Sequence, residues 1–133
     1  MIAANELRIG NWFQQDASNN NAISRFFTVD EIKRYGVRST YIRQDTNQPH
    51  TSLFSLDSIH PIPLTPEILE KCGFDRNCIL KISQGVNIEW SYGKEVWLTK
   101  EGEVIYEFEN TQHLHQLQNI YFALTSTELN YTP

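Results

Sequence analysis

The sequence predicts an α+β protein in which an N-terminal SH3-like five-stranded barrel is followed by a helix, a four-stranded antiparallel meander and a C-terminal helix. Short apolar runs between turn residues fill most of the 133 positions, which indicates many short strands. Two segments, after Thr65 and after Asn110, have helical signals instead. We expect residues 1–64 to form the barrel and residues 65–133 the α-β4-α part, packed on the first as one compact unit.

The expected barrel consists of five short strands, with polar loops at residues 16–21 and 44–50. Residues 61–64 must be extended, because their prolines cannot donate hydrogen bonds to a central strand ladder. A helical turn is expected at residues 57–59, just before this last strand. The other four strands are expected to include residues 9–13, 25–32, 37–43 and 53–56.

A short helix is expected to begin after Thr65 and to end at Gly73. Thr65 is a good N-cap, and Pro66 suits the first helical position. Gly73 can adopt the left-handed conformation that ends a helix, and Phe74 can then fold back onto the last turn.

Four runs with short glycine-bearing connections predict the antiparallel meander. The runs are residues 78–83, 86–92, 95–100 and 103–109. In the last run Val104, Tyr106 and Phe108 alternate with glutamates and Ile105. We therefore expect one face of this strand to be apolar and the other to be wetted.

The C-terminal helix is expected to be capped by Asn110 or Thr111, with one further turn at residues 126–129. Its apolar residues fall within about 120° around the axis, so we expect them to cover the apolar face of the meander. These residues are Leu114, Leu117, Ile120, Tyr121 and Leu124.

One flank of this helix is a candidate interface, formed by His115, Gln118, Asn119 and Phe122. Phe122 lies outside the apolar stripe, among polar side chains. In one interpretation the barrel packs on this flank and Gln118 or Asn119 binds loop backbone. In the other, the flank is exposed and meets an unknown protein partner or a second copy, since aromatic residues are common anchors of interfaces.

The net charge of −5 lies entirely in the second half of the chain. Residues 1–62 carry six basic and six acidic side chains, whereas residues 63–133 carry five basic and ten acidic ones. An acidic half repels phosphate, so nucleic-acid binding would need the first half. The alternative function is therefore a nucleic-acid-binding barrel whose basic and aromatic strip spans residues 25–43, with Arg25, Lys33, Arg34, Arg38, Tyr41 and Arg43 as contacts.

No motif indicates an enzyme, a metal site or a cofactor. Cys72 and Cys78 do not have the spacing of a zinc site. His113 and His115 are expected about 200° apart on one helix, so they would not share an ion unless the helix starts later. No glycine-flanked nucleophile or phosphate loop occurs, so we expect no catalytic residues and no cofactor.

Three segments resemble a family of small uncharacterised proteins of Bacteroidetes genomes and their phages or other mobile elements. The segments are residues 5–11 (NELRIGN), residues 61–74 (PIPLT through Gly73 and Phe74) and residues 115–125 (HQLQNIYFALT). The loops at residues 16–21 and 44–50 look longer than in that family. The resemblance brings no assigned activity, and it implies a phage-like context that favours binding or assembly over metabolism.

The function expected from the sequence is a non-enzymatic interaction or assembly module. No export signal or stretch of about 20 apolar residues is present, so we expect a cytoplasmic protein without a membrane partner.

Overall fold

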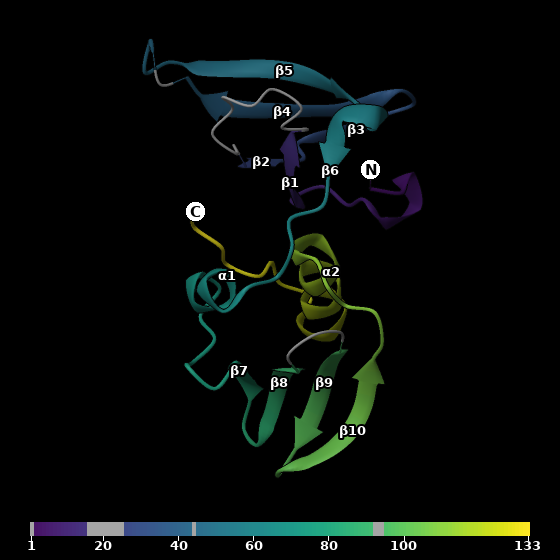
Figure 1. The fold of residues 1–133 in the computed structure, drawn as a ribbon, viewed down its shortest axis with the longest axis vertical. Coiled ribbons are helices and arrows are strands. Elements are labelled where there is room, and N and C mark those ends of the chain that lie inside the picture. Colours follow the sequence, from purple (N-terminus) through teal and green to yellow (C-terminus); the bar gives the residue numbers. More distant parts are fainter. Residues whose placement is uncertain (1, 16–25, 44, 92–94) are drawn as a thin grey trace. The chain divides into compact units, whose positions relative to one another are not determined.

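The computed structural model is an α+β fold with two helices and three antiparallel sheets in the described residues, which are 2–15, 26–43, 45–91 and 95–133 (Figure 1). The chain divides into two compact units, Met1–Ile62 and Pro63–Pro133, here called unit 1 and unit 2. Pro63 and Leu64 belong to unit 2, because Pro63 forms a β-bridge with His113 and Leu64 donates a backbone hydrogen bond to the Gln112 carbonyl.

The described residues of unit 1 form two three-stranded sheets. One has the order β2-β1-β6, formed by Phe26–Thr28, Trp12–Gln15 and Ile59–His60. The other has the order β3-β4-β5, formed by Glu31–Lys33, Gly36–Ile42 and Pro49–Ser55. The described residues of the unit also form two short 3-10 helices, Ala4–Glu6 and Leu56–Ser58.

The described residues of unit 1 form no closed barrel, and they contain six strands where five were expected. The difference arises at Val29 and Asp30, inside the run expected as one strand. The Val29 N–H binds the Asn11 carbonyl at 2.9 Å, whereas the Asp30 N–H binds the Arg38 carbonyl at 2.8 Å. The chain thus passes from one sheet to the other at this point, and the run becomes β2 and β3.

The last strand of unit 1 also lies earlier than expected. β6 comprises Ile59 and His60 and ends before the prolines. Pro49, expected in a loop, begins β5, which pairs only with β4 in the described residues and is an edge strand that tolerates proline.

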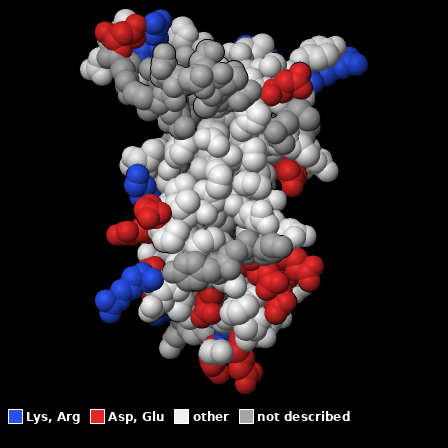
Figure 2. Space-filling view, in the orientation of Figure 1, with Lys and Arg blue, Asp and Glu red and all other residues white. Residues whose placement is uncertain are grey.

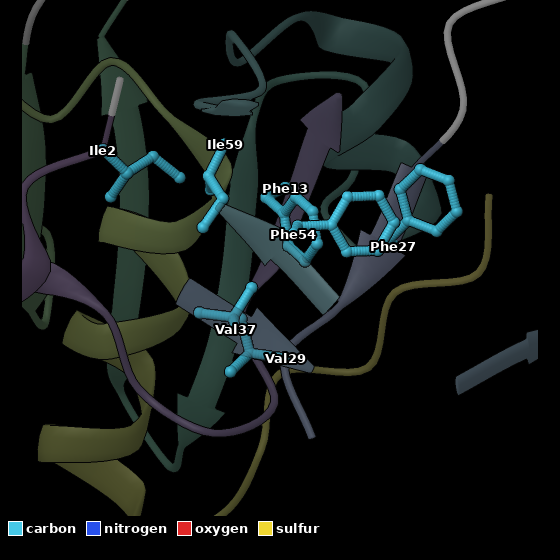
Figure 3. Packing of buried hydrophobic residues seen from close by; sticks show 7 residues of the cluster. All are labelled: Ile2, Phe13, Phe27, Val29, Val37, Phe54 and Ile59. Carbon is cyan, nitrogen blue, oxygen red and sulfur yellow. The ribbon is translucent and has the colours of Figure 1, made fainter. Parts of the chain in front are cut away.

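The core of unit 1 is aromatic (Figure 3). Phe13 is fully buried, and its ring lies 5.7 Å from the ring of Phe27 and 5.3 Å from that of Phe54. The rings of Phe27 and Phe54 lie 4.8 Å apart. The cluster takes side chains from both sheets and from the N-terminal segment: Ile2, Phe13, Phe27, Val29, Val37, Phe54 and Ile59.

The first helix of unit 2 is α1, Pro66–Lys71. Its start after Thr65 and its end before Gly73 confirm the predicted caps. The Ile68 N–H donates to the Thr65 hydroxyl at 3.2 Å. Gly73 has a φ of +95°, and the Phe74 N–H donates to the Leu69 carbonyl at 3.0 Å. Phe74 and Leu69 are both buried, so the chain folds back onto the last turn as in a Schellman motif.

The four runs expected as a meander form one antiparallel sheet of order β10-β9-β8-β7. The strands are β7 (Ile79–Ser83), β8 (Val86–Ser91), β9 (Glu95–Lys100) and β10 (Glu103–Phe108). Ile88 and Val96 are fully buried in the centre of this sheet.

Helix α2, Leu114–Thr125, begins later than expected, because His113 and neither Asn110 nor Thr111 is its N-cap. The Thr111 hydroxyl binds the Phe108 carbonyl at 3.1 Å, and the Gln112 carbonyl accepts from Leu64. These bonds hold Thr111 and Gln112 outside the helix. The Gln116 side-chain oxygen accepts the N–H groups of Gln112 and His113, so the helix starts at the next residue.

The segment after α2 contains no further helical turn, in contrast to the expectation. Leu129 and Tyr131 are buried, and the C-terminal segment runs beside α1 (Figure 1). Burial, and then the nearby Cys72 charge, raise the pKa of Tyr131.

Candidate functional site

Among the described strands of unit 2, β10 has the most exposed residues, and three of them are apolar or aromatic. Val104, Ile105 and Tyr106 expose 47%, 54% and 58% of their surface. β10 lies at one edge of the sheet and pairs only with β9 in the described residues. At the other edge, the apolar side chains of β7 are all partly buried. Three adjacent exposed apolar residues on an edge strand are a typical feature of an interaction surface.

A β-bulge explains why the expected apolar face of β10 does not form. Val104 pairs with Thr99 and Tyr106 with Leu98, so Ile105 is the additional residue. Successive residues of β9 point to opposite faces, and cross-strand partners share a face. Val104 therefore lies on the face opposite Tyr106, and the prediction that Val104, Tyr106 and Phe108 share one covered face is wrong.

The apolar stripe expected on helix α2 is only partly buried. Leu114 and Leu117 are fully buried, whereas Leu124, in the same expected stripe, is 37% exposed. The ring centroids of Tyr106 and Phe108 lie 4.8 Å apart. Between β10 and α2 remains a groove of about 510 Å³, lined by Tyr106, Glu107, Phe108, Glu109, Thr111 and Ile120.

The surface along β10 is acidic. Glu101, Glu103, Glu107 and Glu109 are all exposed, and residues 101–109 contain no lysine or arginine. Figure 2 shows acidic side chains gathered on the β10 side of unit 2. The groove therefore offers two aromatic rings on a strand edge that carries several carboxylates, which suits a cationic or apolar group and disfavours phosphate.

The candidate interface on α2 is only partly accessible. His115 and Gln118 are each 1% exposed, Asn119 is half-buried and Phe122 is 38% exposed. A partner at this flank would contact mainly Phe122 and Asn119, since His115 and Gln118 are buried. The interface role of the flank stays a prediction.

Three of the five cations in the basic strip of unit 1 pair with acidic neighbours. Lys33 and Arg38 both pair with Glu31, at 3.1 and 3.3 Å. Arg43 pairs with Asp45 at 2.7 Å. Such pairing reduces the charge that the strip can offer to phosphate.

The remaining members of the strip do not form a stacking platform. The Arg34 guanidinium lies 5.4 Å from the Tyr35 ring centroid, and Arg25 lies outside the described residues. Tyr41 is half-buried, contacts Phe27 edge-on and shares a hydroxyl hydrogen bond with Ser52 at 3.0 Å. The structure does not bring these side chains together over one aromatic surface.

A second groove lies in unit 1 and has a volume of about 440 Å³. Its lining contains hydroxyl, amide and apolar side chains but no described charged residue: Gln15, Phe27, Tyr41, Ser52, Leu53, Phe54, Ser55 and Ser58. This lining has no cation for a phosphate.

The two neighbouring histidines of α2 do not lie on opposite sides of the helix. His113 precedes the first helical residue, and its ring stacks on that of His115 with centroids 6.0 Å apart and planes 18° apart. In the described part of the chain no three His, Cys, Asp or Glu residues are grouped to hold a metal ion. The Cys72 and Cys78 thiols are both free and buried, and burial raises the pKa of Cys72 to about 12.

Sequence reasoning missed the exposed surface of β10, although one signal was present. Ile105 stands among Glu103, Glu107 and Glu109 on the face expected to be wetted. An isoleucine there, on the last strand of a meander, indicates an exposed apolar edge.

No family model, curated protein or solved structure matches this chain. Among the described residues, no helix is long and apolar enough to cross a membrane.

Proposed function

We propose that the protein is a non-enzymatic interaction or assembly module whose docking surface is β10 and the groove beside it. The observation that carries this proposal is the run Val104–Tyr106, in which three successive apolar side chains are each about half exposed on an edge strand. Exposing them costs hydrophobic free energy that a partner would recover by covering them.

We also propose three further properties that were expected from the sequence. They are an SH3-like arrangement for unit 1, a cytoplasmic location and an origin in phages or mobile elements of Bacteroidetes. The three family-like segments support the origin.

Nucleic-acid binding by unit 1 is the weaker alternative. Glu31 and Asp45 pair with three of the cations that would have to contact phosphates. The measurement that compares the two functions is binding of fluorescent single- and double-stranded oligonucleotides at low and moderate salt, because a phosphate site weakens as salt rises.

The proposed surface can be tested by selecting binders from a random peptide display library. The wild-type protein serves as bait, and the enriched peptides are then tested for binding to a Val104→Thr, Tyr106→Thr double variant. Threonine keeps the strand propensity and the net charge while removing the apolar surface. We expect sequences that depend on the two residues to be enriched.

The matched control is Leu53→Thr, on the edge strand β5 of unit 1, where Leu53 is 61% exposed. This variant should retain the selected peptides. Selected peptides that bind the β10 double variant as strongly as they bind the wild type would contradict the proposed docking surface. So would a selection that enriches no peptide at all.

A further inference from the structure

We infer, resting on the proposed function, that the β10 surface binds an extended, positively charged segment of a partner protein, with a lysine or arginine side chain seated in the groove beside Tyr106 and Phe108. The inference adds the conformation and the charge of the ligand to the proposed docking surface.

The extended conformation follows from the position of β10 in its sheet. In an antiparallel ladder, alternate residues of an edge strand direct their N–H and C=O groups away from the neighbouring strand. β10 has β9 on one side and no described strand on the other. A partner segment can therefore add as a strand, using backbone hydrogen bonds for affinity and side-chain pockets for specificity.

The positive charge follows from the acidic residues along the strand. Glu101, Glu103, Glu107 and Glu109 are exposed, without a basic residue between positions 101 and 109. A second copy of β10 added antiparallel would place two sets of these carboxylates in one interface. Like charges opposite one another destabilise strand pairing, so a basic segment of another protein fits better than self-association.

The groove supplies the seat for one cationic side chain. Tyr106, Phe108 and Ile120 offer apolar surface for the methylene stem of a lysine or arginine. Glu107 and Glu109 also border the groove. Glu107 pairs with Trp97 and so lies on the face opposite Tyr106 and Phe108, but its negative charge at the edge of the sheet still favours a cation nearby, and the head group itself favours the face of an aromatic ring. The groove volume of about 510 Å³ leaves room for such a side chain.

The test uses three short synthetic peptides that have valine at alternate positions and lysine, threonine or glutamate between them. Each is titrated into isotope-labelled protein, and the backbone amide signals of residues 103–109 are followed. We expect only the lysine peptide to shift these signals, and we expect its affinity to fall at higher salt because salt screens exposed charges.

Charge variants separate a specific contact from general attraction to an acidic protein. The double variant Glu107→Gln, Glu109→Gln should bind the lysine peptide roughly fivefold more weakly, as expected for two exposed ion pairs. The control, Glu67→Gln with Glu70→Gln on α1, changes the net charge equally and should bind as the wild type does. Thermal unfolding of all variants checks that they are folded.

The outcomes distinguish this inference from the proposed function. If the threonine or glutamate peptide shifts residues 103–109 as strongly as the lysine peptide, the surface is a docking site but the charge preference is wrong. If none of the three binds while the display selection yields β10-dependent peptides without basic residues, the inference again fails and the docking surface stands. If the selection also yields none, both are wrong.

Discussion

The two units contain aromatic pairs of similar geometry in opposite environments. In unit 1 the rings of Phe27 and Phe54 lie 4.8 Å apart, and both residues are buried. In unit 2 the rings of Tyr106 and Phe108 also lie 4.8 Å apart, but Tyr106 is 58% exposed. The contact distance alone therefore does not show what a ring pair does. The first pair joins two sheets, whereas we propose that the second meets a partner.

The largest expected effect comes from removing a ring of the unit 1 core. Phe13→Ala should lower the free energy of unfolding by roughly 3–5 kcal/mol, because the ring is fully buried against Phe27 and Phe54. Urea denaturation followed by tryptophan fluorescence measures this loss. Tyr106→Ala is the comparison and should change the free energy by less than about 0.5 kcal/mol. Equal losses would mean that the two ring pairs are equally structural.

A smaller loss is expected for Gly36→Ala on β4. A Cβ atom at this position would lie 2.1 Å from the backbone carbonyl oxygen of Phe54, on the neighbouring strand. The two strands would have to separate locally, which should cost roughly 1–3 kcal/mol. An unchanged urea midpoint would show that the β4–β5 pairing yields more easily than its close approach indicates.

Unit 2 should lose stability in alkali through Cys72. Burial raises the pKa of its thiol to about 12 in the folded protein, from an ordinary value of 9.0. Between these values the unfolded chain loses the proton first, so the free energy of unfolding should fall as pH rises from about 9 to about 12. The slope is at most about 1.4 kcal/mol per pH unit.

Urea denaturation at increasing pH, with Cys72→Ala as control, measures this dependence. The variant should lose stability less steeply, and the remaining slope includes Tyr131, whose pKa is also raised. Parallel curves for the two proteins would show that the Cys72 thiol does not cause the loss.

The smallest of these effects is expected at the end of α1. Gly73→Ala should cost about 1 kcal/mol, because Gly73 has a φ of +95° that alanine adopts only with strain. Space is not the cause, since the nearest atom to an added Cβ is the Leu80 Cδ1 at 3.7 Å. The shift of the urea midpoint measures the cost. Gly73→Ala should therefore be milder than Gly36→Ala, and the reverse order would contradict this assignment of conformational and steric causes.

The candidate site shows where sequence reasoning reached its limit. The alternation of Val104, Tyr106 and Phe108 indicated one covered face, but a bulge at Ile105 moved Val104 to the other face. A bulge depends on the strand opposite, so the sequence of β10 alone does not reveal it.

The sequence by itself determined the elements whose signals are local. Thr65 and Gly73 mark the ends of α1, and the glycine-bearing connections separate the strands of the meander, because a cap or a turn acts on residues within a few positions. The tertiary structure decided the rest. Asn11 and Arg38 divide one expected strand between two sheets, and the backbone pairing of Leu64 with Gln112 delays α2. The bonds of Val29 with Asn11 and of Leu64 with Gln112 join residues far apart in the chain, and local propensity does not encode such partners.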